Sequence, residues 1–107
     1  MKKSLAILSL LFFLQQLNAQ GLDLYKKKVY INGKDTLRYC ILYPETYKER
    51  KAYPLVVFLH GSGERGSDNA AQLSHGGEFF TREAIRRYFP AIVIFPQCPA
   101  GEKWSDF

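Results

Sequence analysis

The sequence predicts an α/β fold of which the chain holds an incomplete part. Two short unbroken apolar runs, residues 55–59 (LVVFL) and 91–95 (AIVIF), are typical of strands in a parallel sheet that is covered on both faces. The 31 residues between them are first rich in glycine and then helical in character. A hairpin signal precedes both runs. Together these features predict a hairpin followed by a strand-helix-strand unit.

The hairpin prediction is based on residues 27–31 and 36–42, which read as strands on either side of Asn32-Gly33. This dipeptide favours a type I′ turn, in which both central residues need a positive φ. In the crossover, Asp68 or Asn69 is expected to cap a short helical turn. Thr81 is expected to cap a longer helix through about Tyr88.

The first 19 residues have the pattern of a secretory signal peptide. Lys2 and Lys3 precede an apolar run over residues 5–14 (LAILSLLFFL), and the small residue Ala19 follows. The run is too short to span a bilayer, which takes roughly 20 residues. We expect cleavage after Ala19, a domain over residues 20–107, a secreted or periplasmic location and no stable membrane anchor.

The charge distribution argues against a nucleic-acid partner. The sequence has 15 Lys and Arg residues against 10 Asp and Glu residues, and loss of Lys2 and Lys3 would leave 13 basic residues. These are scattered apart from residues 26–28 (KKK), which lie at a predicted strand where lysines protect a sheet edge.

Two strands covered on both faces need a helix layer on each side, and one crossover helix cannot supply both layers. The chain also ends in a predicted loop in which Trp104 and Phe107 are expected to be exposed. We therefore expect residues 20–107 to be the first part of a larger domain.

A glycine-rich loop, residues 60–66 (HGSGERG), follows the first apolar strand. Its glycines match G-x-G-x-x-G, but no helix begins inside the motif and no ribose-binding acid follows the next strand, so a dinucleotide site is disfavoured. A phosphate-binding P-loop needs Lys before Ser or Thr, whereas Ser67 and Asp68 stand there. The third interpretation is an oxyanion hole made by backbone N–H groups.

The motifs resemble those of a known family. Residues 53–66 (YPLVVFLHGSGERG) look like the third-strand region of α/β-hydrolase-fold esterases of the dienelactone hydrolase, phospholipase/carboxylesterase and prolyl-oligopeptidase-like type. Residues 92–99 (IVIFPQCP), followed by Trp104, are similar to that family's next strand, and the resemblance covers about residues 29–107. It implies an incomplete α/β-hydrolase fold, with an N-terminal antiparallel hairpin and a strand-helix-strand unit of a mostly parallel sheet.

The resemblance also implies a function: hydrolysis of small-molecule carboxylic esters by Ser-His-Asp chemistry, with no metal and no organic cofactor. Ser62 stands where the family places an oxyanion donor, which acts through its backbone N–H. Gly61 and Gly63 would keep the turn open to substrate. Trp104 would line the acyl or alcohol pocket or would simply pack.

Other residues of the loop have expected structural roles. His60 looks like the family's structural hydrogen-bonding histidine and not like a general base. Glu64 and Arg65 are expected to brace the loop. His75 has no motif around it and is expected to be a surface residue or a satisfied polar one. Asp106 is expected to be a solvated loop residue and not a triad acid.

The departures from the family pattern concern the catalytic triad. None of Ser62, Ser67, Ser74 and Ser105 lies in a G-x-S-x-G frame, and in this fold the order is Ser, acid, His. The triad is expected beyond residue 107, and the 107 residues alone are expected to be inactive. Two alternatives stay open: a secreted binding module without catalysis, and a degenerate hydrolase remnant.

The family's strand pairing also bears on the two cysteines. It places Cys40 opposite the middle of residues 91–95, with Cys98 past the end of that strand. Their separation would exceed the roughly 7 Å between Cα atoms that a disulfide allows. We expect two buried free thiols.

Overall fold

The computed structural model describes residues 21–107, so the predicted signal peptide lies outside the described residues. The strands are β1 (Lys26–Asn32), β2 (Asp35–Leu42), β3 (Leu55–Val57) and β4 (Ile92–Gln97). The helices are α2 (Gly77–Thr81) and α3 (Glu83–Tyr88), with 3-10 turns η1 (Ser62–Glu64), η2 (Ala71–Leu73) and η3 (Trp104–Asp106). None of the helices in residues 21–107 has the length and apolar character needed to cross a membrane.

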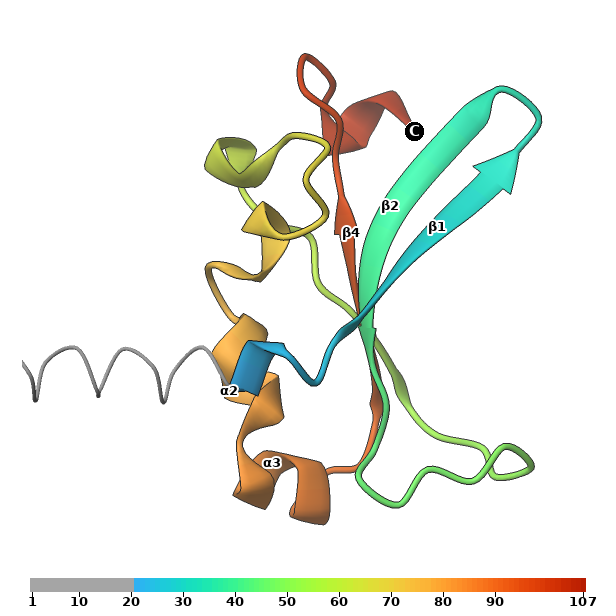
Figure 1. The fold of residues 1–107 in the computed structure, drawn as a ribbon, viewed down its shortest axis with the longest axis vertical. Coiled ribbons are helices and arrows are strands. Elements are labelled where there is room, and N and C mark those ends of the chain that lie inside the picture. The colour runs from blue at the N-terminus through green and yellow to red at the C-terminus, as the bar shows by residue number, and fades with distance from the viewer. Residues whose placement is uncertain (1–20) are drawn as a thin grey trace, which may run out of the picture.

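The four strands form one sheet in the order β1-β2-β4-β3 (Figure 1). The expected hairpin and strand-crossover-strand unit are both present, and β3 pairs with β4 in parallel. β2 pairs antiparallel with both β1 and β4, and the pairing with β4 is the one that the family resemblance implies. A mostly parallel sheet in the larger domain stays a prediction. The single crossover creates the parallel pair β3–β4, the hairpin is the antiparallel pair β1–β2, and β2 joins the two units by pairing antiparallel with β4.

The hairpin turn is centred one residue later than predicted. Asn32 pairs with Asp35, so Gly33 and Lys34 are the central residues. Gly33 has a φ of +61°, whereas the only non-glycine residue with positive φ in residues 21–107 is Asn69. Positive φ at the first central position alone is the pattern of a type II′ turn. Gly33 takes the position with positive φ, which glycine adopts without strain because it has no Cβ. Lys34, which has a Cβ, occupies the position where φ is negative.

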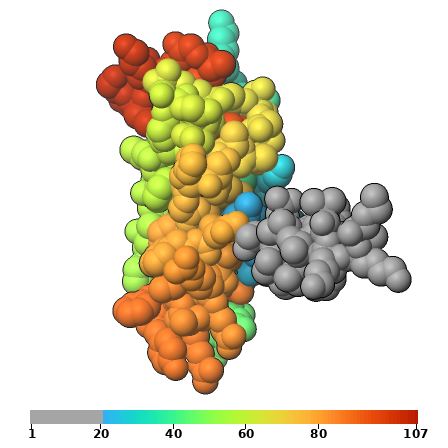
Figure 2. All heavy atoms as spheres, turned by 90° about the vertical axis from the view of Figure 1, so that its left-hand side faces the viewer, coloured from blue at the N-terminus to red at the C-terminus, as the bar shows by residue number. Residues whose placement is uncertain are grey.

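The core lies on the face of the sheet that carries the crossover. Figure 1 shows the crossover segment on one side of the sheet, and Figure 2 shows it as a continuous layer from yellow-green to orange. Alternate residues of the strands point into this layer. The buried core residues are Tyr25, Cys40, Leu42, Leu73, Val93 and Phe95, with Leu22, Val56, Phe58, Phe80 and Ala91 packed against them.

The opposite face of β3 is bare within the described residues. Leu55, Val57 and Leu59 are 60%, 54% and 55% exposed, while Val56 between them is partly buried. The prediction that residues 55–59 are covered on both faces is therefore wrong for this part of the chain. The physical reason is that the crossover packs on one face only (Figure 1).

β4 runs through Pro96, where the sequence predicted its end. Pro96 pairs with Tyr39 on the β2 side. On the β3 side, the Phe58 N–H donates to the Ile94 carbonyl at 2.9 Å. In a parallel ladder, the Phe58 carbonyl would then accept from the N–H of residue 96, and proline has none. Pro96 thus explains why the β3–β4 ladder ends while β4 itself continues.

The predicted helix caps have different outcomes. Asp68 caps the turn before η2, because its Oδ1 accepts from the N–H groups of Ala70 and Ala71 at 3.0 and 3.1 Å. Thr81 does not cap a helix. It ends α2, and its hydroxyl donates to the Glu78 carbonyl at 2.9 Å. The longer predicted helix is split, because Arg82 has an extended backbone between α2 and α3.

Both cysteines are buried free thiols, as expected. The expected register is wrong, because Cys40 pairs with Phe95, the last residue of the run 91–95, and not with the middle of that run. Cys98 follows β4. Burial raises the pKa of the Cys40 thiol.

Candidate functional site: the glycine-rich loop

The glycine-rich loop leaves the carboxyl end of β3 and turns beside the segment that follows β4. Figure 2 shows the C-terminal residues, in red, against the yellow-green loop at one end of the molecule. Two hydrogen bonds join loop and segment directly. The Gly66 N–H donates to the Cys98 carbonyl at 3.0 Å, and the Cys98 N–H donates to His60 Nε2 in the side chain at 2.9 Å. Gly66 has a φ of +151°, a backbone conformation that favours glycine.

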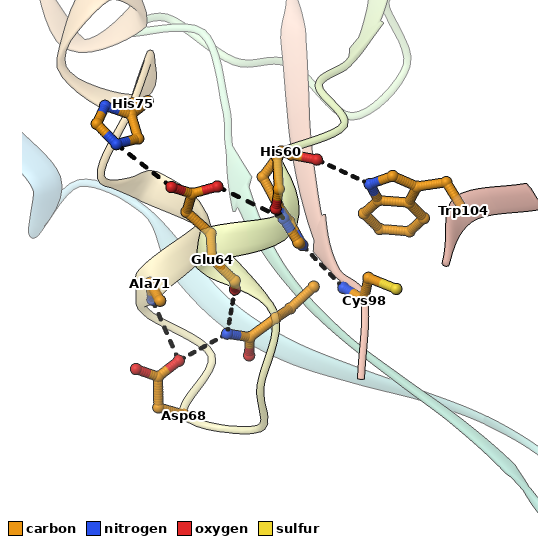
Figure 3. Close-up of polar contacts among 9 residues, drawn as sticks. His60, Glu64, Asp68, Ala71, His75, Cys98 and Trp104 are labelled. Carbon is orange, nitrogen blue, oxygen red and sulfur yellow. Dashed lines mark hydrogen bonds and ion pairs between the residues drawn. The ribbon is translucent and has the colours of Figure 1, made fainter. Parts of the chain in front are cut away.

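His60 is buried, and both of its ring nitrogens have hydrogen-bond partners (Figure 3). Its Nε2 accepts the Cys98 N–H, so the neutral ring must carry its proton on Nδ1. That nitrogen lies 2.6 Å from the Gly61 carbonyl and donates to it. His60 is thus the structural hydrogen-bonder expected from the sequence, with no free nitrogen to serve as a base.

The direction of the Ser62 N–H follows from these contacts. The Gly61 carbonyl and the Ser62 N–H belong to one planar trans peptide and point in opposite directions. The carbonyl is held by His60 Nδ1 and accepts the Glu64 N–H at 3.4 Å. The Ser62 N–H therefore points away from the loop interior, and no residue in 21–107 accepts a hydrogen bond from it. Ser62 itself is exposed.

The space beside this N–H is open. Gly61 and Gly63 are both exposed, and a Cβ added at Gly63 would meet no atom within 4 Å. At Gly61 the nearest atom would be Glu64 Oε2 at 3.2 Å. Neither glycine has positive φ. The backbone conformation therefore does not require glycine at these two positions. Glycine there would instead leave room for a substrate to approach.

Gln97 is a residue of this region that the sequence analysis missed. Its side chain is 1% exposed. Its Oε1 accepts the Asn69 N–H at 2.7 Å, while Nε2 donates to the Glu64 carbonyl at 3.2 Å and to Asp68 Oδ1 at 2.7 Å. One amide group thus ties Glu64 in the loop, and Asp68 and Asn69 directly after it, to the end of β4. The sequence signal for Gln97 was a polar residue in the continuation of a buried strand. The signal was missed because Pro96 suggested that the strand ends before Gln97.

The hydrogen bonds on Asp68 affect its ionisation. The Gln97 amide, followed by the N–H groups of Ala71 and Ala70, lowers the pKa of the Asp68 carboxyl below its usual value of 3.8. At neutral pH Asp68 is therefore a charged carboxylate, and in this form it holds the segment that follows the loop.

Glu64 braces the loop as expected. Its carboxylate lies between two histidines in Figure 3, 3.3 Å from His75 Nε2 and 4.0 Å from His60 Nδ1. His75 is exposed, as predicted. The expectation for Arg65 is wrong within residues 21–107, where its guanidinium makes no hydrogen bond or ion pair with any described residue. Asp106 is exposed and caps η3 by accepting the Lys103 N–H at 2.8 Å.

Trp104 packs on the loop. Its indole Nε1 donates to the His60 carbonyl at 2.9 Å, and its ring lies edge-on to the imidazole at a centroid distance of 5.0 Å (Figure 3). The side chain is half-buried, so the expected exposure is wrong for Trp104 and right for Phe107. The reason is that η3 folds back onto the loop. A place for Trp104 in a substrate pocket stays a prediction.

An apolar hollow of about 650 Å³ lies at the opposite end of the sheet, where β3 and β4 begin. Pro54 and Ala91 line it together with aromatic residues of α2 and α3. It is distant in the fold from the glycine-rich loop, which follows the other end of β3. In residues 21–107 no group of three or more His, Cys, Asp or Glu side chains could hold a metal ion.

The fold has a solved counterpart. The chain is similar to a protein described as a thermostable esterase in its crystal structure, with a TM-score of 0.70 and 31% sequence identity. The fold is esterase-like. The match covers 78% of this chain but only 23% of the esterase, so the chain spans less than a quarter of its neighbour's length. No family model and no curated protein matches the chain.

Proposed function

We propose that these 107 residues form the opening part of an exported serine hydrolase that acts on small carboxylic esters. The observation that carries the proposal is the outward direction of the Ser62 N–H on an exposed loop of an esterase-like fold, where no residue in 21–107 accepts a hydrogen bond from it. The signal-like pattern of residues 1–19 supports a secreted or periplasmic location.

In this proposal the Ser62 N–H is one of two oxyanion donors. Attack on an ester carbonyl places negative charge on its oxygen, and preorganised donors stabilise that charge strongly in a site that excludes water. In α/β-hydrolases one donor comes from the loop after the third strand, and the other from the residue after the nucleophile. The Ser62 hydroxyl takes no part.

The nucleophile, acid and base of the proposed Ser-His-Asp triad would lie beyond residue 107. Both ring nitrogens of His60 are occupied by hydrogen bonds, one to Gly61 and one to Cys98, and His75 is exposed and paired with Glu64. No serine in the sequence lies in a G-x-S-x-G frame. The 23% share of the esterase that the chain spans supports the same division.

The test compares the purified 107-residue chain with the product of the longest reading frame that contains it. Each is assayed for p-nitrophenyl acetate hydrolysis and for covalent labelling by a fluorophosphonate. We expect hydrolysis and serine labelling only in the longer product.

Two results would contradict the proposal. If the 107-residue chain is labelled, the nucleophile lies within it, and a Ser62→Ala variant of that chain then shows whether Ser62 is the labelled residue. If no product is labelled or active, a binding module or a degenerate hydrolase becomes the better explanation.

A further inference from the structure

We propose that Trp104 is a positioning residue for the oxyanion donor: through the His60 carbonyl it sets the direction in which the Ser62 N–H points. The inference rests on the proposed function, because it concerns the same donor. It assigns to Trp104 a role distinct from lining a substrate pocket.

Two consecutive peptide units, 60–61 and 61–62, lead to the Ser62 N–H. Each unit is held by a hydrogen bond that its carbonyl accepts from a side chain. Trp104 Nε1 holds the His60 carbonyl at 2.9 Å and thereby the 60–61 peptide plane. His60 Nδ1 holds the Gly61 carbonyl at 2.6 Å and thereby the 61–62 plane. The indole thus restrains the first of the two peptide planes that precede the Ser62 N–H.

Trp104 also restrains the second plane, because it contacts the imidazole ring that holds it. The two rings meet at 62° with centroids 5.0 Å apart, while Cys98 N–H fixes the ring at Nε2. The edge-on indole limits rotation of the ring about this hydrogen bond. One side chain therefore acts on both the backbone and the side chain of His60.

The chain itself cannot supply this restraint. Gly61 and Gly63 flank Ser62, and residues without Cβ leave the backbone free to rotate. A flexible loop can keep a donor preorganised only if neighbouring groups hold it. The short turn η3 presents Trp104 for this purpose, closed by the Asp106 N–H to Lys103 carbonyl bond at 3.0 Å.

The test uses residual dipolar couplings, which report the direction of individual N–H bonds. In Trp104→Phe, which keeps an aromatic ring but loses the donor, we expect the couplings of Gly61 and Ser62 to move toward zero. Those of β4, such as Phe95, should be unchanged. Phe107→Leu is the matched control, because Phe107 packs against Trp104 at 6.1 Å without a hydrogen bond to the loop.

A second variant separates the hydrogen bond from the packing. Trp104 is the only tryptophan in the 107 residues. Biosynthetic replacement by benzothienylalanine therefore changes one position, and it exchanges the N–H for sulfur in a ring of similar shape. We expect it to reproduce the effect of Trp104→Phe at Gly61 and Ser62.

Activity gives an independent arm. If the longest reading frame yields an active enzyme, Trp104→Phe should lower kcat by about 10- to 100-fold with little change in KM, as expected for a misplaced catalytic group. Unchanged couplings, or changed couplings with an unchanged kcat, would overturn the positioning role. Changed couplings in a protein that has no activity in any form would support the role in the loop while refuting the proposed function.

Discussion

Replacing Phe95 with alanine is expected to lower the free energy of unfolding by about 3–5 kcal/mol. Phe95 is 0% exposed at the centre of the core. Its ring stacks on Phe58 at 4.6 Å and meets Tyr25 and Phe80 edge-on at 5.5 and 5.9 Å. The substitution removes these contacts and leaves a cavity between the sheet and the crossover. Since domains have only about 5–15 kcal/mol of stability, the loss would unfold much of the protein.

Urea denaturation followed by circular dichroism measures this effect. Phe89→Ala is the matched control, because it makes the same chemical change at a side chain that is 71% exposed. We expect it to change stability by less than about 0.5 kcal/mol. Equal effects at the two positions would show that Phe95 is not the centre of the core.

Replacing Gln97 with alanine is expected to lower the free energy of unfolding by about 3 kcal/mol. The substitution removes three buried or partly buried hydrogen bonds and leaves the Asn69 N–H without its acceptor. The loss should be concentrated in the loop. Amide hydrogen exchange should therefore accelerate more at Asn69 and Gly66 than in β2. Uniform acceleration, or none, would contradict the role of Gln97 as the tie between loop and strand.

Asp68→Asn is the companion to this variant. It keeps an Oδ1 acceptor for Gln97, Ala70 and Ala71 but has no charge, so the loop should stay formed at neutral pH. The carboxyl pKa is depressed in the folded state. Its stabilising contribution is thus present above the usual value of 3.8 and is lost as the pH falls through the folded value. The wild-type chain should lose more stability than Asp68→Asn over that acidic range.

Much of the fold was predictable because it depends on local patterns. The apolar runs predicted β3 and β4, and the turn signal predicted the hairpin to within one residue. The errors arose where tertiary context decides. The alternating exposure of Leu55, Val56 and Val57 reflects a crossover that packs on one face, which an unbroken apolar run does not reveal.

The site was predictable in position but not in construction. The motif over residues 60–66 indicated the loop and the roles of His60 and Glu64. The loop is held by groups 30 or more positions away, namely Gln97, the Cys98 backbone and Trp104. Such long-range hydrogen bonds leave no periodic signal in a sequence.

The central claim is that the Ser62 backbone N–H, and not its hydroxyl, stabilises an oxyanion. Ser62→Pro removes the N–H at a position that tolerates proline. Ser62 opens η1, and Gly61 has the extended backbone (φ −79°, ψ −179°) that a residue before proline adopts. Ser62→Ala removes only the hydroxyl.

The measurement that tests this claim most directly is kcat for ester hydrolysis of the two variants in the longest reading frame. We expect Ser62→Pro to lower kcat by about 10²- to 10³-fold, the cost of losing one oxyanion donor. Ser62→Ala should stay close to the wild-type value. Loss of activity in Ser62→Ala, or full activity in Ser62→Pro with the fold intact, would contradict the account.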